Sequence, residues 1–576
     1  MPEQSESYAQ TTFCVAFHQS NLQEKAYLTN SKFEQWQKNG KINEIILTSV
    51  RCITSMKHYL ATFLLACIMP AITARAQVWR EGGEHGKIKL GKGLGYTLEA
   101  QATVSSAQTP LWLNANKHGL SSLEKTNGYL LAGIERPLAT DSTRRWGLGY
   151  GLNIALTQGF TSRIVVDQAF VQARWLYATL TIGSKRHDME LKNDALSSGS
   201  QLLGINARPV PQVRLALPDY WTLPFGNGWL HLKGHVAYGK TTDDNWQKRF
   251  TGQQRLYTEN VLYHSKAGYF MIGNPERFVP LSLEMGLEMA STFGGTSYQP
   301  LDDGTVRVIR GRTGVKSFWK AFLPGGADVG ETTYQNAEGN QLGAWLARVN
   351  YNAETWKFGL YVDKYFEDHS AMLQVDYDGY GTGDEWMQKK KRRFLIYDFK
   401  DWMFGAELNF KYGRWITDVV LEYLYTKYQS GPIYHDHTKT IADHLGGQDN
   451  YYNHYIYTGW QHWGQVMGNP LYRSPLYNTN GNINVANNRF TAWHLGIGGK
   501  PTDELSYRFL ATYQNGLGTY AEPFEKKEYN VSLMLEGCYQ LPNEWNVTAA
   551  LGADMGRIFG NKCGVQFTVA KKGLFK

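Results

Sequence analysis

The sequence lacks any apolar run of the roughly 18 or more residues that a membrane-spanning helix requires. Its mean hydropathy is negative. The lack of a long apolar run and the negative mean hydropathy together exclude a helical membrane protein. They leave a membrane β-barrel open, because the lumen-facing half of each barrel strand is polar.

Cysteine is also scarce, with five residues in a chain of 576. Cys14, Cys52 and Cys67 precede residue 77, where we expect the mature protein to begin. The remaining two, Cys538 and Cys563, fall on opposite faces of their predicted strands. That placement disfavours a disulfide between them, because bonded cysteines must have neighbouring Cβ atoms.

Acidic charge is slightly outnumbered by basic charge, with a formal net charge of +8, and no basic cluster is larger than residues 389–393. A nucleic-acid partner is therefore disfavoured. The mild excess fits a partner with acidic sugars or lipid phosphates without requiring one.

A secretory leader is predicted at an unusual place. Met56-Lys57-His58 precedes an apolar run over residues 59–72 that ends in Ala74-Arg75-Ala76. A basic start, a short apolar centre and an A-x-A end are typical of a signal peptide. We predict an upstream extension that is not native over residues 1–55, a signal peptide over 56–76, a short extended segment over 77–94 and one domain over 95–576.

Most segments after residue 95 alternate between apolar and polar residues. In residues 279–293, for example, Leu281, Met285 and Met289 alternate with Ser282, Glu284 and other polar or small residues. A strand presents successive side chains to opposite faces, so each segment has one apolar and one polar face. The runs reach about 10–13 residues, a length that spans a bilayer when the strand is tilted.

The pattern predicts an all-β fold: a transmembrane, antiparallel, up-and-down β-barrel of about 18 strands. Short connections, such as 352–354 and 541–544, are expected in the periplasm. Long ones, at 187–228, 294–340, 378–401, 428–489 and 515–529, are expected outside the cell. Aromatic residues make up 14% of the chain, which fits girdles at both membrane interfaces. The predicted strands are 95–105, 129–136, 146–156, 164–174, 176–185, 229–238, 260–272, 281–293, 342–351, 355–362, 371–377, 402–410, 416–425, 490–498, 505–513, 531–539, 545–555 and 563–570.

The connection around residues 435–475 is rich in histidine and aromatic residues, which suggests a glycan-binding surface. Aromatic rings stack on sugar C–H faces, while carboxylate, amide and imidazole groups hydrogen-bond to hydroxyls. The alternative is a loop folded into the lumen, with its aromatics used for packing. His435-Asp436-His437 also resembles a weak metal-ligand set, but no metal or other cofactor is predicted. The candidate glycan contacts are Asp449, Asn450, Tyr452, His454, Trp460 and Trp463.

Two further clusters have functional and structural interpretations. His264 and Lys266 share a strand face, so they form a basic lumen site or pair with the inward Glu284 and Glu288 of the next strand. A serine-rich segment around Ser197 suggests a hydrolase alternative, although it contains no G-x-S-x-G elbow.

Several segments resemble the Wzi-like capsule assembly family of outer-membrane proteins, in the form found in Bacteroidetes. They are residues 111–119, 196–211, 259–266, 280–295 and, most specifically, 446–470. The resemblance implies an eighteen-stranded barrel and association with capsular polysaccharide or exopolysaccharide. Enterobacterial members have an N-terminal helical bundle that plugs the barrel, for which the segment before the first strand is too short. No catalytic residues carry over.

We therefore predict a protein without enzymatic activity, in the outer membrane of a Gram-negative bacterium, that binds or organises surface polysaccharide. A solute channel and a lipid or glycan hydrolase remain the alternatives. The expected partners are the polysaccharide, outer-membrane lipid and, during biogenesis, the barrel-assembly machinery, and the protein is expected to be a monomer.

Overall fold

The computed structural model describes residues 88–277, 279–323, 339–367, 401–429 and 449–575, and the backbone of 373–375 and 394–396. These residues belong to one compact unit, Trp79–Lys576. The predicted leader and the extension before it lie outside the described residues, as does His435-Asp436-His437.

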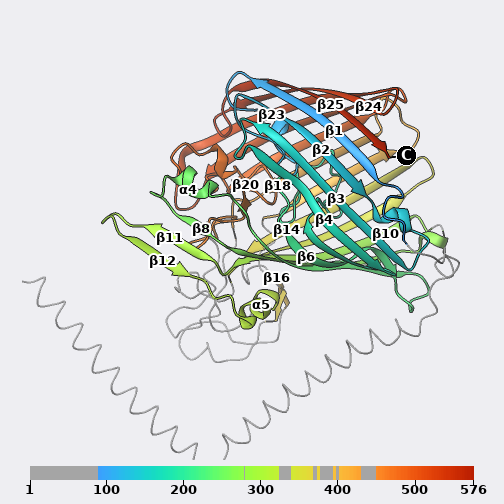
Figure 1. Cartoon of the computed structure of the whole chain (residues 1–576), viewed down its shortest axis with the longest axis horizontal. Coiled ribbons are helices and arrows are strands. Elements are labelled where there is room, and N and C mark those ends of the chain that lie inside the picture. The colour runs from blue at the N-terminus through green and yellow to red at the C-terminus, as the bar shows by residue number, and fades with distance from the viewer. Residues whose placement is uncertain are drawn as a thin grey trace, which may run out of the picture. The chain divides into compact units, whose positions relative to one another are not determined.

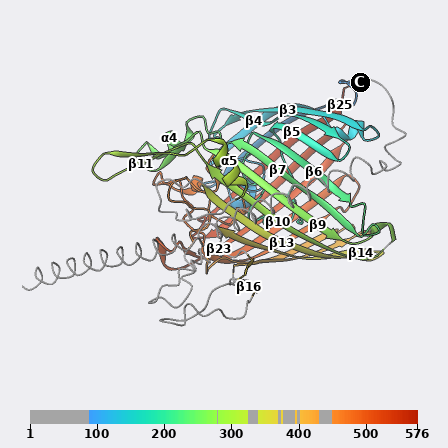
Figure 2. The same cartoon turned by 90° about the horizontal axis from the view of Figure 1, so that it is seen from below.

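Eighteen antiparallel strands form a closed barrel, which confirms the predicted fold class (Figures 1 and 2). Closure is made by the first and last strands, where Gly95 pairs with Leu574. The barrel strands are β1 (Gly95–Ser105), β2 (Thr126–Arg136), β3 (Trp146–Gln158), β4 (Ile164–Trp175), β5 (Ala178–Ser184), β6 (Gln212–Thr222), β7 (Leu230–Lys240), β9 (Leu262–Ile272), β10 (Leu281–Phe293), β13 (Asn340–Asn352), β14 (Trp356–Glu367), β17 (Met403–Phe410), β18 (Asp418–Tyr425), β21 (Phe490–Gly499), β22 (Leu505–Gly518), β23 (Pro523–Leu541), β24 (Trp545–Gly556) and β25 (Lys562–Leu574).

The other elements belong to the connections. No helix in the described part of the chain has the length and apolar character needed to cross a membrane. The short strands are β8 (Tyr257–Glu259), β11 (Thr296–Pro300), β12 (Val306–Arg310), β15 (Leu373–Val375), β16 (Phe394–Ile396), β19 (Gln461–His462) and β20 (Gln465–Val466). The helices are α3 (Leu111–Asn114), α4 (Trp246–Thr251), α5 (Val315–Phe322), η2 (Leu138–Asp141), η3 (Pro275–Arg277) and η5 (Pro475–Tyr477).

Three details of the strand prediction were wrong. The sequence predicts that residues 212–222 belong to the long connection 187–228, whereas they form β6 of the barrel. Their alternation is interrupted by Pro218 and by a register shift between Leu217 and Trp221. In the predicted strand 371–377 the described residues, 373–375, form β15, which pairs with β16 and not with the barrel. The predicted loop 515–529 is reduced to residues 519–522, because β22 and β23 extend into it.

The two ends of the barrel differ in their connections. At the short-turn end lie connections such as 353–355, 500–504 and 542–544, together with the start of β1 and the end of β25. At the long-loop end lie connections such as 185–211, 241–261 and 426–489. This segregation confirms the predicted alternation of short and long connections.

The outer face of the wall is apolar. Leu130, Leu156 and Ile164 are each about 60% exposed, which suits a surface that contacts lipid and not water. Exposed aromatic side chains cluster toward both ends, with Trp146 and Trp175 near the short turns and Trp493 and Tyr529 near the long loops. Such belts mark the two interfaces of a membrane.

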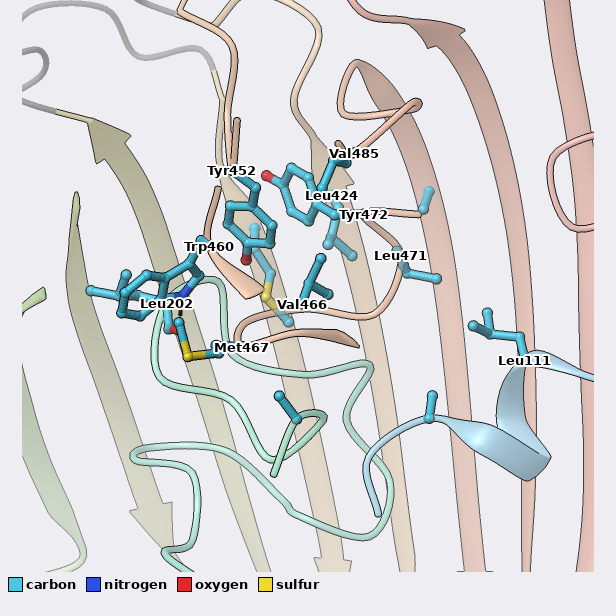
Figure 3. Close-up of a cluster of buried hydrophobic side chains, with 14 of the residues drawn as sticks. Leu111, Leu202, Leu424, Tyr452, Trp460, Val466, Met467, Leu471, Tyr472 and Val485 are labelled. Atoms are coloured by element: carbon cyan, nitrogen blue, oxygen red, sulfur yellow. Dashed lines mark hydrogen bonds between the residues drawn. The ribbon is translucent and has the colours of Figure 1, made fainter. Parts of the chain in front are cut away.

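The largest hydrophobic cluster lies inside the lumen. It joins α3 and two long connections, residues 185–211 and 449–489, to the inner face of the wall. Figure 3 shows Leu202 of the first connection beside Trp460 and Met467 of the second. We call these two connections the plug.

Buried polar groups of the wall hold the plug in place. Lys192 forms an ion pair with Asp363 on β14 at 2.7 Å, and neither side chain is exposed to solvent. The carboxylate of Glu422 on β18 accepts hydrogen bonds from Ser197 Oγ at 2.5 Å and from the Ser198 N–H at 2.8 Å. Because a buried charge requires a partner, these contacts make the plug an integral part of the fold.

Between the plug and the short turns the lumen is hollow. A chamber of about 1150 Å³ is lined by plug residues 185–195 and by wall side chains that include Arg214, Lys233 and Arg348. Its lining reaches Pro137 and Ser142, in the connection between β2 and β3 at the short-turn end.

Candidate functional site

A crevice of about 530 Å³ lies at the long-loop end, where five connections meet. Its volume falls within the range of about 300–1,000 Å³ that is usual for ligand sites. Aromatic rings and hydrogen-bonding groups share its lining. The lining residues are Ala107, Gln108, Gly119, Ser121, Ser122, Leu123, Glu124, Lys125, Gly159, Phe160, Thr161, Arg208, Trp246, Phe250, Trp463, Gln465 and Leu476.

Trp463 occupies the tip of the small hairpin formed by β19 and β20. The two turn residues, Trp463 and Gly464, both have positive φ, at 57° and 78°. A two-residue turn with this conformation matches the twist of a hairpin. A positive φ is uncommon for a bulky side chain, and residues held in this way gather at functional sites. The turn places the half-buried indole of Trp463 in the wall of the crevice.

Substitution of Gly464 by alanine tests this turn. An added Cβ would lie 2.6 Å from the ring of Trp246, in a backbone conformation that already disfavours side chains. We expect the left-handed φ alone to cost about 1–2 kcal/mol, and the collision to add to that cost. Urea unfolding of the detergent-folded protein measures the total.

The control is Gly252→Ala, at φ +56° with nothing within 4 Å of the added Cβ. Gly252→Ala therefore introduces a side chain at a left-handed φ without a collision, so it measures the conformational cost alone. Equal losses of stability in the two variants would show that the approach of Gly464 to Trp246 does not matter.

Arg208, from the plug, packs against Trp463. Its guanidinium carbon lies 4.1 Å from the centre of the indole ring, within the range of a cation–π contact. Its nitrogens donate to Thr161 Oγ1 at 2.8 Å and to Ser162 Oγ at 3.1 Å. Among the described residues no carboxylate lies within 4.0 Å of it. Burial lowers the pKa of Arg208 to about 10, so it is charged at neutral pH.

Side chains below Trp463 fix the hairpin to its surroundings. His462 Nδ1 lies 2.8 Å from the carbonyl oxygen of Arg208, and its Nε2 accepts the Thr242 N–H at 3.1 Å. One ring nitrogen thus donates and the other accepts, as in a neutral imidazole. Burial lowers the pKa of His462 to about 4, consistent with that form. Gln465 Nε2 donates to Ser121 Oγ at 3.0 Å.

Tyr452 and Trp460, two of the six predicted glycan contacts, lie in the core of the plug. Both are 0% exposed. Tyr452 donates its hydroxyl to the carbonyl oxygen of Gln201, and Trp460 Nε1 donates to that of Leu202 at 3.0 Å. Their ring faces are covered by protein, so these rings are not available to a sugar in this structure. The prediction that they contact glycan is therefore corrected to a packing role.

The next three predicted contacts also serve the plug. Asp449 is 4% exposed. Asn450 Oδ1 accepts from Asn488 Nδ2 at 2.6 Å and from Asn453 Nδ2 at 2.9 Å. His454 Nδ1 accepts the Ile456 N–H at 3.0 Å, and burial lowers the pKa of His454 to about 4.

Of the six predicted residues, only Trp463 lines the crevice. Sequence reasoning missed Arg208, Trp246 and Ser121, which come from separate connections. A Trp-Gly pair between two short polar-apolar segments was the one local signal for the hairpin that carries Trp463.

The predicted lumen position of His264 and Lys266 was wrong. Both share a face of β9 with Ile272, which is 37% exposed on the outer surface. The short helix α5 packs on β9 and β10 there. The ring of His264 stacks on Tyr238 at 4.4 Å, and Lys266 Nζ donates to the Phe322 carbonyl oxygen. Because α5 covers these polar groups, they lie outside the barrel without facing lipid.

Glu284 and Glu288 do face the lumen, but they pair with other groups than predicted. Glu284 accepts from Tyr220 Oη at 2.7 Å and from Asn350 Nδ2 at 2.8 Å. Glu288 accepts from Tyr269 Oη at 2.6 Å.

The serine segment that suggested a hydrolase is buried in the plug. Ser197 and Ser198 are 1% and 0% exposed. Ser197 donates to Glu422 and not to a histidine, and Ser198 Oγ accepts from Asn469 Nδ2 at 3.1 Å. These contacts anchor a loop. They differ from the serine–histidine pair of a hydrolase.

No family model matches the sequence, and no curated protein matches it either. Solved structures do resemble the barrel. Wzi of Escherichia coli, described as an outer-membrane protein involved in group 1 capsule assembly and a carbohydrate-binding β-barrel, has a TM-score of 0.49 at 11% identity, over 83% of this chain and 84% of that one.

Two further similar structures are OprD of Pseudomonas aeruginosa and the outer-membrane channel DcaP of Acinetobacter baumannii. OprD has a TM-score of 0.38 at 8% identity, over 84% of this chain and 94% of that one. DcaP has a TM-score of 0.35 at 8% identity, over 83% of this chain and 96% of that one. The likeness in all three concerns the fold.

Proposed function

We propose that this protein is a non-enzymatic outer-membrane barrel that binds polysaccharide at the cell surface through the crevice at its long-loop end. The observation that supports the proposal most is the pairing of Trp463 with the buried, charged Arg208 in the crevice wall. A ring and a guanidinium beside hydroxyl and amide groups can stack on a sugar and hydrogen-bond to its oxygens. The sequence resemblance to capsule assembly proteins agrees with this class of ligand.

The direction of the crevice follows from the two ends of the barrel. Outer-membrane barrels place short turns in the periplasm and long loops outside. The crevice, lined by residues of the long-loop end, would therefore face the extracellular polysaccharide of a Gram-negative cell. Binding should be weak for one sugar and stronger along a repeating polymer.

Trp463→Ala is expected to weaken binding to the capsular polysaccharide of the host about three- to tenfold, which corresponds to roughly 0.7–1.4 kcal/mol. The loss follows from removal of one stacking ring while the plug stays intact. Isothermal titration of the detergent-folded barrel with the polysaccharide measures it.

Trp415→Ala is the matched control, because Trp415 is 75% exposed and lies between β17 and β18 at the short-turn end. Its loss should leave affinity unchanged. If both variants bind as tightly as wild type while heat-modifiable gel mobility shows folded barrels, the crevice is not the glycan site.

A solute channel is the second candidate, and the chamber in the short-turn half of the lumen favours it. A channel requires a continuous path, whereas the plug fills the lumen at the other end. Conductance in planar bilayers separates the two functions.

A further inference from the structure

A second, smaller cavity lies between residues of the plug and the inner face of the wall. Its volume is about 100 Å³, enough for several water molecules. Trp460 and Met467 of the plug line one side of it. Lys185, His187 and Arg214 line both this cavity and the chamber, so the two spaces adjoin.

Arg214 is the central feature of this cavity. It projects inward from β6, opposite Thr181 on β5 and Ala237 on β7, while its neighbours Val213 and Leu215 face outward. Among the described residues no hydrogen bond, and no ion pair within 4.0 Å, joins its guanidinium to another group, and the carboxylates of Glu190 and Glu288 act on it only from farther away. A guanidinium inside a barrel usually has a carboxylate partner, because an unpaired charge is costly there.

Two other donors converge on the same space. His187 Nε2 is buried and has no hydrogen-bond partner. Lys185 Nζ donates to Gln172 Oε1 at 2.5 Å and lies 4.5 Å from the ring centre of Phe170, so at least one of its protons is uncommitted. An Arg fork with a lysine and an imidazole is a set of groups that binds oxyanions.

The acidic residues of the cavity are mostly engaged. Glu190 forms an ion pair with Lys233 at 2.5 Å, and Glu288 Oε1 accepts from Tyr269. The second oxygen of Glu288 is buried without a partner. If Glu288 is protonated, that oxygen becomes one more donor to an anion. Asp188 lines both the cavity and the chamber, and it is exposed.

We propose that the cavity between Arg214, His187 and Lys185 binds a small oxyanion, either inorganic phosphate or the carboxylate of a sugar acid, that enters from the periplasmic chamber. Arg214 binds two oxygens through its fork, Lys185 adds a second positive charge, and the His187 imidazole adds a hydrogen-bond donor. Arg208 lines both this cavity and the crevice, but none of the three proposed anion ligands lines the crevice, so the proposal does not depend on the glycan proposal.

The test uses the full, detergent-folded protein with sodium phosphate and sodium glucuronate as probes, at constant ionic strength. Titration calorimetry and thermal melting follow binding. Wild type should show saturable binding and a rise in melting temperature with at least one probe, since a ligand that binds only the folded state stabilises it. The probe that binds more tightly identifies the class of anion.

Arg214→Met should weaken binding at least tenfold and Arg214→Lys should weaken it less, because lysine retains the charge without the fork. Without anion, Arg214→Met should melt no lower than wild type, because it removes an unpaired charge. Glu288→Gln should keep or strengthen binding.

Lys357→Met is the control, since Lys357 lines the chamber but not the cavity. It should bind as wild type does, and so should Trp463→Ala. The proposal is wrong if wild type shows no saturable binding with either probe, if Arg214→Met binds equally well, or if Lys357→Met loses as much affinity as Arg214→Met.

Discussion

Replacing residues 185–211 by a short Asn-Gly turn should convert a silent barrel into one that conducts ions in planar bilayers. Gly183 of β5 pairs directly with Gln212 of β6, so a hairpin can join the two strands without the connection. An eighteen-stranded barrel encloses a lumen wide enough for water once its filling is removed, as in barrels of roughly 16–18 strands. Stable, step-like currents are the expected readout.

Removal of this connection should also loosen the second part of the plug. Trp460 would lose its acceptor at Leu202, and the Met467 carbonyl would lose the Gly204 N–H, which donates to it at 2.9 Å. Wild-type protein prepared in the same detergent is the control. Step-like conductance in wild type would favour the channel over the surface binder. A folded but silent variant would mean that other connections close the lumen.

Trp460→Ala should lower the free energy of unfolding by about 3–5 kcal/mol, the usual cost of truncating a buried tryptophan. The indole is 0% exposed, stacks on Tyr263 at 5.9 Å and donates to the Leu202 carbonyl. Truncation removes this packing and leaves that carbonyl without its donor. Urea unfolding followed by tryptophan fluorescence and gel mobility measures the loss.

The matched substitution is Trp463→Ala, three residues along the same hairpin. Its ring is half-buried and its Nε1 lies 3.4 Å from Thr242 Oγ1, so its loss should cost about 1 kcal/mol or less. The two variants therefore separate stability from binding: Trp460 acts on the plug and Trp463 on the crevice. Equal losses of stability would contradict the burial on which this distinction rests.

Alternation along the chain was sufficient to predict the wall. The segment 281–293 matches β10 at both ends, and 95–105 matches β1. Each strand of a membrane barrel contacts lipid on one face, so apolar residues occur at every second position of its sequence. The prediction failed at β6, where Pro218 and a register shift break the period, and at 371–377, where a local alternation belongs to a small separate sheet.

The candidate site was much less predictable. Tyr452 and Trp460 are aromatic residues of the kind that stack on sugars, yet they lie in the core of the plug. Aromatic rings with hydrogen-bonding groups suit a filled lumen as well as a glycan site, because a polar barrel interior also requires both. Arg208 and Trp246 join Trp463 only through contacts between separate connections.

The sequence by itself determined the barrel, most of its strands and the difference between its two ends. Each strand has one face toward lipid and one toward the lumen, so the alternation of apolar and polar residues can be recognised within the strand itself. Tertiary structure alone decided which loops enter the lumen, which rings remain accessible, and that α5 covers His264 and Lys266 on the outer face. These features depend on contacts between residues far apart in the chain, such as the ion pair of Lys192 with Asp363. The alternation of residues within a single strand does not indicate such contacts.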